Sequence, residues 1–202
     1  MIIGIDFDNT IACYDHAFSF AAHDMGLLPD ETGGDKAQIK ARVLAGAGGE
    51  KAWMKLQGRV YGYYIGLAEM FPGFAAFVLA ARAKGHQLKI ISHKSQFGHF
   101  DPDHIDLTVA ARGWMREQGF FERSGLGFDL DDVAFYPVRS AKLEAIARRR
   151  CDVFIDDLPE IFSNPGFPDT ARKFLFSPGG LPPADGLCVC RTWQDLEMAI
   201  LA

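Results

Sequence analysis

The stretch that decides the fold is residues 2–10, Ile-Ile-Gly-Ile-Asp-Phe-Asp-Asn-Thr. An apolar run typical of a buried strand ends here in two carboxylates, Asp6 and Asp8, with Thr10 just beyond. A buried strand rarely carries unpaired acids, because taking a charge out of water is costly unless the charge is paired. Two anions a few ångströms apart repel each other by roughly 4 kcal/mol at an effective dielectric constant near 20. The stretch therefore calls for a cation, a shared proton or an electrophile beside it.

The composition bounds the class of protein. The chain has 202 residues, enough for one substantial core and a small additional subdomain, and it is 49% hydrophobic and 23% charged, as in ordinary globular proteins. With a formal net charge of -5, the chain lacks the excess of basic residues expected of a protein that binds nucleic acid or an anionic membrane. No apolar run is long enough for a membrane span, and a first strand beginning at Ile2 leaves no room for a signal peptide. We therefore expect a cytoplasmic protein with a small-molecule partner; the sequence favours no oligomeric state.

Short apolar runs alternate with longer helical patterns along most of the chain, which is typical of a parallel sheet covered by helices on both faces. The expected strands are residues 2–5, 87–91, 133–136, 153–155, 173–176 and 187–190. The expected helices are residues 74–84, 106–118, 140–150 and 192–201. This alternation predicts a doubly wound, Rossmann-like α/β core with a mainly parallel sheet.

Residues 12–71 do not fit this alternation. Their patterns are helical, around residues 15–25, 35–44 and 50–69. A structureless loop of this length is uncommon inside a compact domain. We therefore expect a core formed by residues 1–11 and 72–202, with a small helical cap subdomain, residues 12–71, inserted after the first strand.

Polar side chains follow several of the expected strands. Ligands of an open parallel sheet bind outside the carboxyl ends of its strands, so residues at these ends are candidates for a site. Besides Asp6 and Asp8, the candidates are Ser92, His93 and Lys94 after the second strand, Lys142 at the start of the helix after the third, and Asp156 and Asp157 at the end of the fourth. We expect these side chains to converge.

In these residues the chain resembles the haloacid dehalogenase (HAD) superfamily of hydrolases. The family has four motifs: Asp-x-Asp-x-Thr, a Ser or Thr after the second strand, a Lys, and a strand that ends in an acidic pair. Here they look like residues 6–10, Ser92, Lys142, and Asp156 with Asp157, in the family's order. Any one motif arises by chance, but four in order, each at a strand end or helix start, are a specific signal.

The resemblance implies a division of labour between the first two carboxylates. Asp6 would attack phosphorus and form an aspartyl-phosphate, which splits one difficult displacement into two easier steps. Asp8 would protonate the leaving oxygen and then activate water, as a general acid and base. Dehalogenases of the family lack an Asp at the position of Asp8 and need no Mg²⁺, so this residue argues for phosphoryl transfer.

The resemblance also implies a metal site. Mg²⁺ would be held by a carboxylate oxygen of Asp6, the backbone carbonyl of Asp8 and a carboxylate of the acidic pair, with Asp156 favoured over Asp157. Such hard oxygen ligands suit Mg²⁺. Lys142 would balance the carboxylate charge beside this site and bind phosphoryl oxygens.

Several further residues are candidate substrate contacts. Ser92 and Thr10 offer hydroxyl groups, and His93 lies next to Ser92 in the sequence. Lys94 competes with Lys142 as the phosphate-binding lysine, because it stands only two residues past Ser92. Arg59, in the expected cap, is a cationic candidate for a second anionic group of the substrate. The alternative for such residues is structural: a capping serine, a histidine that ends a loop or a solvated lysine.

We therefore expect a Mg²⁺-dependent phosphomonoester hydrolase that acts on a small soluble metabolite, a sugar phosphate or a nucleotide. A phosphomutase or another phosphotransferase could use the same Asp6 and Asp8 with a different acceptor. A non-catalytic protein that binds phosphate ligands on the same scaffold is the alternative from another class.

Overall fold

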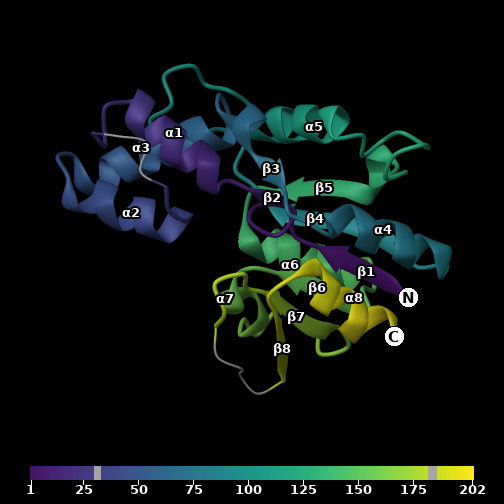
Figure 1. Cartoon of the computed structure of the whole chain (residues 1–202). Coiled ribbons are helices and arrows are strands. Elements are labelled where there is room, and N and C mark those ends of the chain that lie inside the picture. Colours follow the sequence, from purple (N-terminus) through teal and green to yellow (C-terminus); the bar gives the residue numbers. More distant parts are fainter. Residues whose placement is uncertain (30–32, 182–185) are drawn as a thin grey trace. The chain divides into compact units, whose positions relative to one another are not determined.

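The computed structural model describes residues 1–29, 33–181 and 186–202, and the chain forms two compact units (Figure 1). The first, here called the core unit, consists of Met1–Ala12, Met70–Lys94 and Gly119–Ala202. The second, here called the helical unit, consists of Cys13–Glu69 and Ser95–Gln118. Two short paired strands, β2 (Ala12–Cys13) and β3 (Glu69–Met70), lie where the chain passes from one unit to the other.

A six-stranded sheet forms the centre of the core unit. Its strand order is β5-β4-β1-β6-β7-β8, and neighbouring strands run parallel. The bounds are β1 Ile2–Ile5, β4 Gln87–His93, β5 Val133–Tyr136, β6 Val153–Asp156, β7 Arg172–Phe176 and β8 Leu187–Cys190. In this order β1 lies between β4 and β6, so the chain continues from β1 to strands on both of its sides. Sheets of this kind bind ligands in a crevice at such a point, here at the carboxyl end of β1. The predicted Rossmann-like α/β fold is confirmed.

Helices flank this sheet. They are α4 (Phe74–Ala83), α6 (Arg139–Arg148), the short α7 (Pro159–Phe162) and α8 (Trp193–Leu201), with a 3₁₀ turn, η2 (Leu130–Asp132), before β5. The helix α6 packs against β4 and β5, and α4 packs against β4 and α8. Apolar side chains of β1 and β6, such as Ile3, Ile5 and Phe154, are fully buried, as expected for strands covered on both faces.

The helical unit contains α1 (Asp15–Asp24), α2 (Lys36–Ala45), α3 (Gly49–Tyr61), the 3₁₀ turn η1 (Ile65–Leu67) and α5 (Leu107–Glu117). The predicted helix over residues 50–69 is too long, because the chain leaves helical geometry at Gly62, with φ -112° and ψ -88°. None of the described helices combines the length and the apolar character needed to cross a membrane.

Residues 95–118 belong to the helical unit, whereas the sequence analysis placed them in the core. The reason is a close approach between Gly58 of α3 and Gly98: a Cβ on Gly98 would lie only 2.4 Å from the Cα of Gly58. Farther along, α5 packs against α3 and η1, and Trp114 Nε1 donates a hydrogen bond of 2.9 Å to the carbonyl of Ala68. These contacts join segments that are far apart in the sequence.

Candidate active site

Two carboxylates lie side by side at the carboxyl edge of the central sheet. Asp6 directly follows β1, and its backbone N–H donates to the carbonyl of Ile155 in β6 at 2.9 Å. Asp156 is the last residue of β6. Both residues are buried, with 5% of Asp6 and none of Asp156 exposed. Parallel neighbouring strands that end together therefore bring these acids into one place.

The loop after Asp6 is fixed by its own backbone. The N–H groups of Ile11 and Ala12 both donate to the carbonyl of Phe7, at 2.9 and 3.1 Å. Asn9 has a φ of 58° and donates its N–H to the carbonyl of Ala12 at 2.9 Å. Asparagine is among the few residues other than glycine that adopt this left-handed conformation readily. The turn therefore holds the segment that carries Asp8 and Thr10 directly after the strand.

The cation that the sequence calls for is Lys142, from the first turn of α6. Its Nζ donates to Asp6 Oδ1 and to Asp156 Oδ2, each at 2.5 Å, and the residue is 1% exposed. Burial, together with the charge of Asp156, raises the pKa of Asp6 to about 7, against the opposing effect of Lys142. Burial by itself lowers the pKa of Lys142, but the two carboxylates outweigh this effect and hold it above its usual value. The buried charges thus compensate one another.

Three carboxylates could share a metal ion. Among the described residues, Asp6, Asp156 and Asp157 each offer an oxygen, and these oxygens lie within 4.8 Å of one another. The second oxygen of Asp156 accepts a hydrogen bond of 3.0 Å from the N–H of Leu158, which fixes its orientation. Carboxylate oxygens in this arrangement fit a hard cation such as Mg²⁺. The side chain of Asp8 is not in this group.

Asp8 is bound by Lys94 instead. Lys94 Nζ donates to Asp8 Oδ1 at 2.9 Å and to Oδ2 at 2.7 Å. The sequence analysis proposed Lys94 as a substrate contact and a rival of Lys142, and it did not foresee this pairing. Both lysines lie at the site: Lys142 binds Asp6, and Lys94 binds Asp8. The spacing of Lys94 beyond Ser92 was the available signal, but it does not say which carboxylate the amine reaches.

Two buried hydroxyl groups at the site have no partner in the described part of the chain. Thr10 Oγ1 and Ser92 Oγ are both buried without a hydrogen bond. Thr10 follows the β1 turn, and Ser92 lies in β4, opposite Phe135 of β5. A buried hydroxyl left without a partner costs about 1–3 kcal/mol. Such orphaned groups beside a carboxylate cluster are therefore candidates to bind an oxygen-rich ligand.

The other two predicted contacts have structural partners. His93 Nε2 donates to the carbonyl of Pro137 at 3.1 Å, which ties the end of β4 to the loop after β5. Arg59 lies in the helical unit, where its guanidinium pairs with Asp101 at 3.1 Å and with Asp103. The side chain of Asp101 is fully buried. The sequence analysis did not single out these two partners of Arg59, Asp101 and Asp103.

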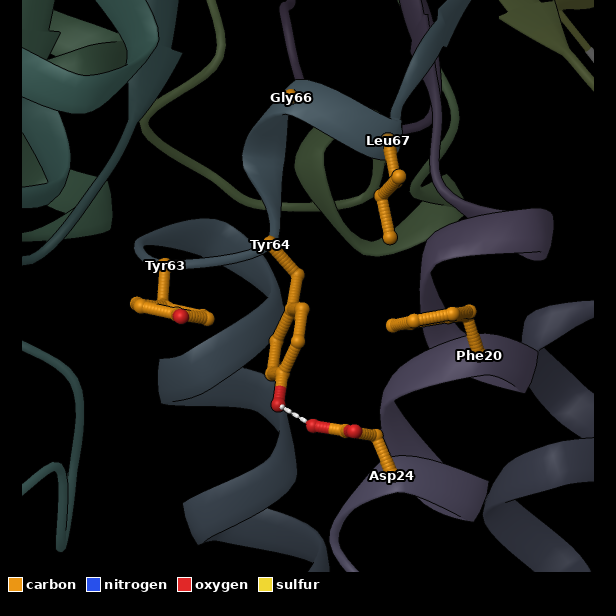
Figure 2. A pocket seen from close by; sticks show the side chains of 6 residues that line it. All are labelled: Phe20, Asp24, Tyr63, Tyr64, Gly66 and Leu67. Carbon is orange, nitrogen blue, oxygen red and sulfur yellow. Dashed lines mark hydrogen bonds between the residues drawn. The ribbon is translucent and has the colours of Figure 1, made fainter.

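A separate pocket lies within the helical unit (Figure 2). Its volume is about 410 Å³, and its lining residues are Phe20, Asp24, Tyr63, Tyr64, Gly66 and Leu67. The hydroxyl of Tyr64 donates to the carboxylate of Asp24 in its wall. None of the site residues predicted from the sequence lines this pocket, although the guanidinium of Arg59 lies 4.3 Å from the ring centre of Tyr63.

Comparisons with known proteins identify the fold. No protein-family model and no curated protein matches the sequence. Solved structures do match over nearly the whole chain. A family IA HAD hydrolase from Entamoeba histolytica has 12% identity and a TM-score of 0.59, covering 96% of this chain and 94% of that one. A haloacid dehalogenase-like hydrolase from Streptococcus pneumoniae has 14% identity and a TM-score of 0.59, covering 99% and 97%. An L-2-haloacid dehalogenase has 15% identity and a TM-score of 0.55, covering 100% and 98%. With the six-stranded parallel sheet described above, the chain has the HAD-like hydrolase fold.

Proposed function

We propose that this protein is a Mg²⁺-dependent phosphomonoester hydrolase that acts through an aspartyl-phosphate on Asp6. The observation that carries the proposal is the arrangement of Asp6, Asp156 and Lys142 at the carboxyl edge of the sheet, together with the orphaned hydroxyls of Thr10 and Ser92. A substrate with several anionic oxygens would satisfy both the cation and the hydroxyl groups. The proposed substrate is a small soluble metabolite, a sugar phosphate or a nucleotide.

The proposed metal ligands are Asp6, Asp156 and Asp157, with the backbone carbonyl of Asp8. When bound, Mg²⁺ would polarise the phosphoryl group and offset its negative charge. Lys142 holds Asp6 and Asp156 in place through its two hydrogen bonds, and it favours the ionised, nucleophilic form of Asp6.

In the first step, a carboxylate oxygen of Asp6 attacks phosphorus and the bond from phosphorus to the leaving oxygen breaks. Asp8 gives its proton to that oxygen, so an alcohol departs. In the second step, Asp8 takes a proton from water, the water oxygen attacks phosphorus and the bond to Asp6 breaks. Inorganic phosphate is released, and Asp6 returns to its carboxylate form.

The groups that bind the phosphoryl oxygens are proposed to be Ser92, Thr10 and Lys142. Donors that are already in place need no reorganisation when charge develops in the transition state. Thr10 and Ser92 fit this role because their oxygens are buried and have no described partner. His93 and Arg59 have no part in the chemistry proposed here, since their side chains are bound to Pro137 and to Asp101 with Asp103.

The experiment is a hydrolysis assay with an aryl phosphate and a panel of sugar phosphates and nucleotides, with Mg²⁺ and with a chelator. Asp6→Asn removes the nucleophile and is expected to lower kcat by at least about 10³-fold. Asp8→Asn removes the proton donor and is expected to lower kcat by about 10²- to 10⁴-fold. Asp131→Asn, at an exposed carboxylate of η2, is the matched control and should hydrolyse like the native chain.

Two results would overturn parts of this proposal. Equal hydrolysis by the native chain and Asp6→Asn would show that Asp6 is not the nucleophile. Full activity in the presence of chelator would show that the reaction does not need the metal. A 2-haloacid in the same panel tests the carbon–halogen chemistry named for one protein of similar fold. Phosphate transfer to an added alcohol in place of phosphate release would indicate a phosphotransferase.

A further inference from the structure

We propose that Lys94 is a positioning residue, which holds the side-chain carboxyl group of Asp8 in the orientation from which its protonated form gives a proton to the leaving group. The inference rests on the proposed function, because Asp8 has an acid and base role only in that reaction. It differs from the prediction made from the sequence, in which Lys94 contacts the substrate. The two roles lead to different kinetic results.

The contact between the two side chains uses both carboxylate oxygens. Lys94 Nζ lies 2.9 Å from Asp8 Oδ1 and 2.7 Å from Oδ2, so rotation of the carboxylate stretches at least one bond. The Lys94 side chain is 2% exposed and that of Asp8 is 16% exposed. Water therefore competes little for the ammonium, and the pair stays together more firmly than an ion pair on the surface.

Lys94 is fixed at its other end as well. Its backbone N–H donates to the carbonyl of Tyr136 at 2.8 Å, which continues the pairing of β4 with β5 by one residue. Its ammonium lies 5.6 Å from the ring centre of Phe7 and 6.0 Å from that of Phe135, within the range of cation–π attraction. These two rings pack edge to face, 5.8 Å apart. The amine is thus held by strands of the core, as a positioning group requires.

The two lysines divide the carboxylates between them. Lys142 binds Asp6 and Asp156, which are the proposed nucleophile and a proposed metal ligand. Lys94 binds Asp8, the proposed proton donor. Each acid of the opening pair is thus bound by a different lysine.

The test compares two substrates that differ in their leaving groups. An aryl phosphate with a stable oxyanion departs without a proton, whereas an alkyl phosphate needs one. The ratio kcat/KM covers the steps up to departure of the leaving group, so it does not include the later activation of water. Lys94→Met is expected to lower kcat/KM by about 10²-fold for the alkyl phosphate and by less than about threefold for the aryl phosphate.

The matched control is Lys89→Met, because Lys89 lies in β4, close to Lys94 in the sequence, and also forms an ion pair, with Asp132. Lys89→Met should leave kcat/KM unchanged for both the alkyl and the aryl phosphate. In an Asp8→Asn background, Lys94→Met should add no further loss, since the group that it positions is already gone. The double variant also removes both charges of this ion pair, so neither remains without the other.

Equal losses on both substrates, with weaker inhibition by inorganic phosphate, would mean that Lys94 contacts the phosphoryl group and would overturn the proposal. Crystal structures of the variants test the proposal without an activity measurement. The Asp8 side chain should change its position in Lys94→Met and keep it in Lys89→Met. An unmoved Asp8 overturns the proposal even in a protein without turnover. Absence of hydrolysis by the native chain on every phosphate would instead refute the proposed function.

Discussion

At the scale of single residues, Asn9 sets the direction of the chain between the proposed proton donor and the Thr10 hydroxyl. Its φ of 58° is costly for most side chains, and especially for those branched at Cβ. Its backbone N–H also closes the turn on Ala12. The geometry of Asp8 therefore depends on a residue that carries no catalytic group.

We predict that Asn9→Val lowers the free energy of unfolding by about 1–2 kcal/mol, because valine is strained in the left-handed conformation. Asn9→Gly adopts this conformation freely and should change stability by less than about 0.5 kcal/mol. Urea denaturation of the two variants and the native chain measures the difference. Equal stability of the valine and glycine variants would show that the turn relaxes to another conformation.

At the scale of the elements, the sequence predicted the six strands of the sheet to within two residues, because apolar runs and helix ends are local signals. It ended the second strand at Ile91, since Ser92 and His93 are polar; in the structure both residues still pair with β5. Polar side chains at this end of the strand belong to the site, so the hydrophobic pattern stops before the backbone pairing does. The strands β2 and β3 have two residues each, which is too short for any periodicity.

The grouping of α5 with the helical unit could not be read from local patterns. It depends on the contact between the backbones of Gly58 and Gly98, which are forty positions apart. A glycine in sequence gives no sign of which other backbone it approaches. Burial of Asp101 beside Arg59 has the same origin, because the ion pair joins α3 to the segment before α5.

We predict that Gly98→Ala destabilises the helical unit, because its Cβ would lie 2.4 Å from Gly58 Cα and neither backbone can move away freely. Overpacking of this kind costs about 1–3 kcal/mol. Gly113→Ala in α5 is the control: nothing lies within 4 Å of its Cβ, and alanine should stabilise the helix by about 0.5–1 kcal/mol. Hydrogen exchange of α3 and α5 peptides measures both effects, and equal protection in the two variants would contradict the prediction.

At the scale of the whole molecule, the fold class and most of the core site followed from the sequence. Parallel strands place their carboxyl ends at one edge, so residues that follow different strands had to meet there. Lys142 with Asp6 and Asp156 is the clearest case. The pairing of Lys94 with Asp8 did not follow, because two lysines near two carboxylates allow more than one assignment until their directions are known.

Metal binding is predicted to stabilise the core unit, since the proposed ligands come from segments that are distant in the sequence. At a Mg²⁺ concentration of 100 times its Kd, the gain is about 2.7 kcal/mol. Thermal unfolding of the native chain should shift upward with Mg²⁺, while Asp156→Asn should lose most of this shift. Asp131→Asn should keep it. An equal shift in all three proteins would mean that Mg²⁺ binds elsewhere.

The division of the chain has a consequence for attempts to take the protein apart. The helical unit is assembled from two separate segments, so the backbone crosses between the units four times, after Ala12, Glu69, Lys94 and Gln118. Deleting residues 12–71 would strip α5 of its partners and expose the buried face that carries Trp114. A single protease cut in either segment would give two fragments, each with residues of both units, so it would not release the helical unit by itself. The helical unit is therefore not a removable insert, and exchange with a relative would have to graft both segments together.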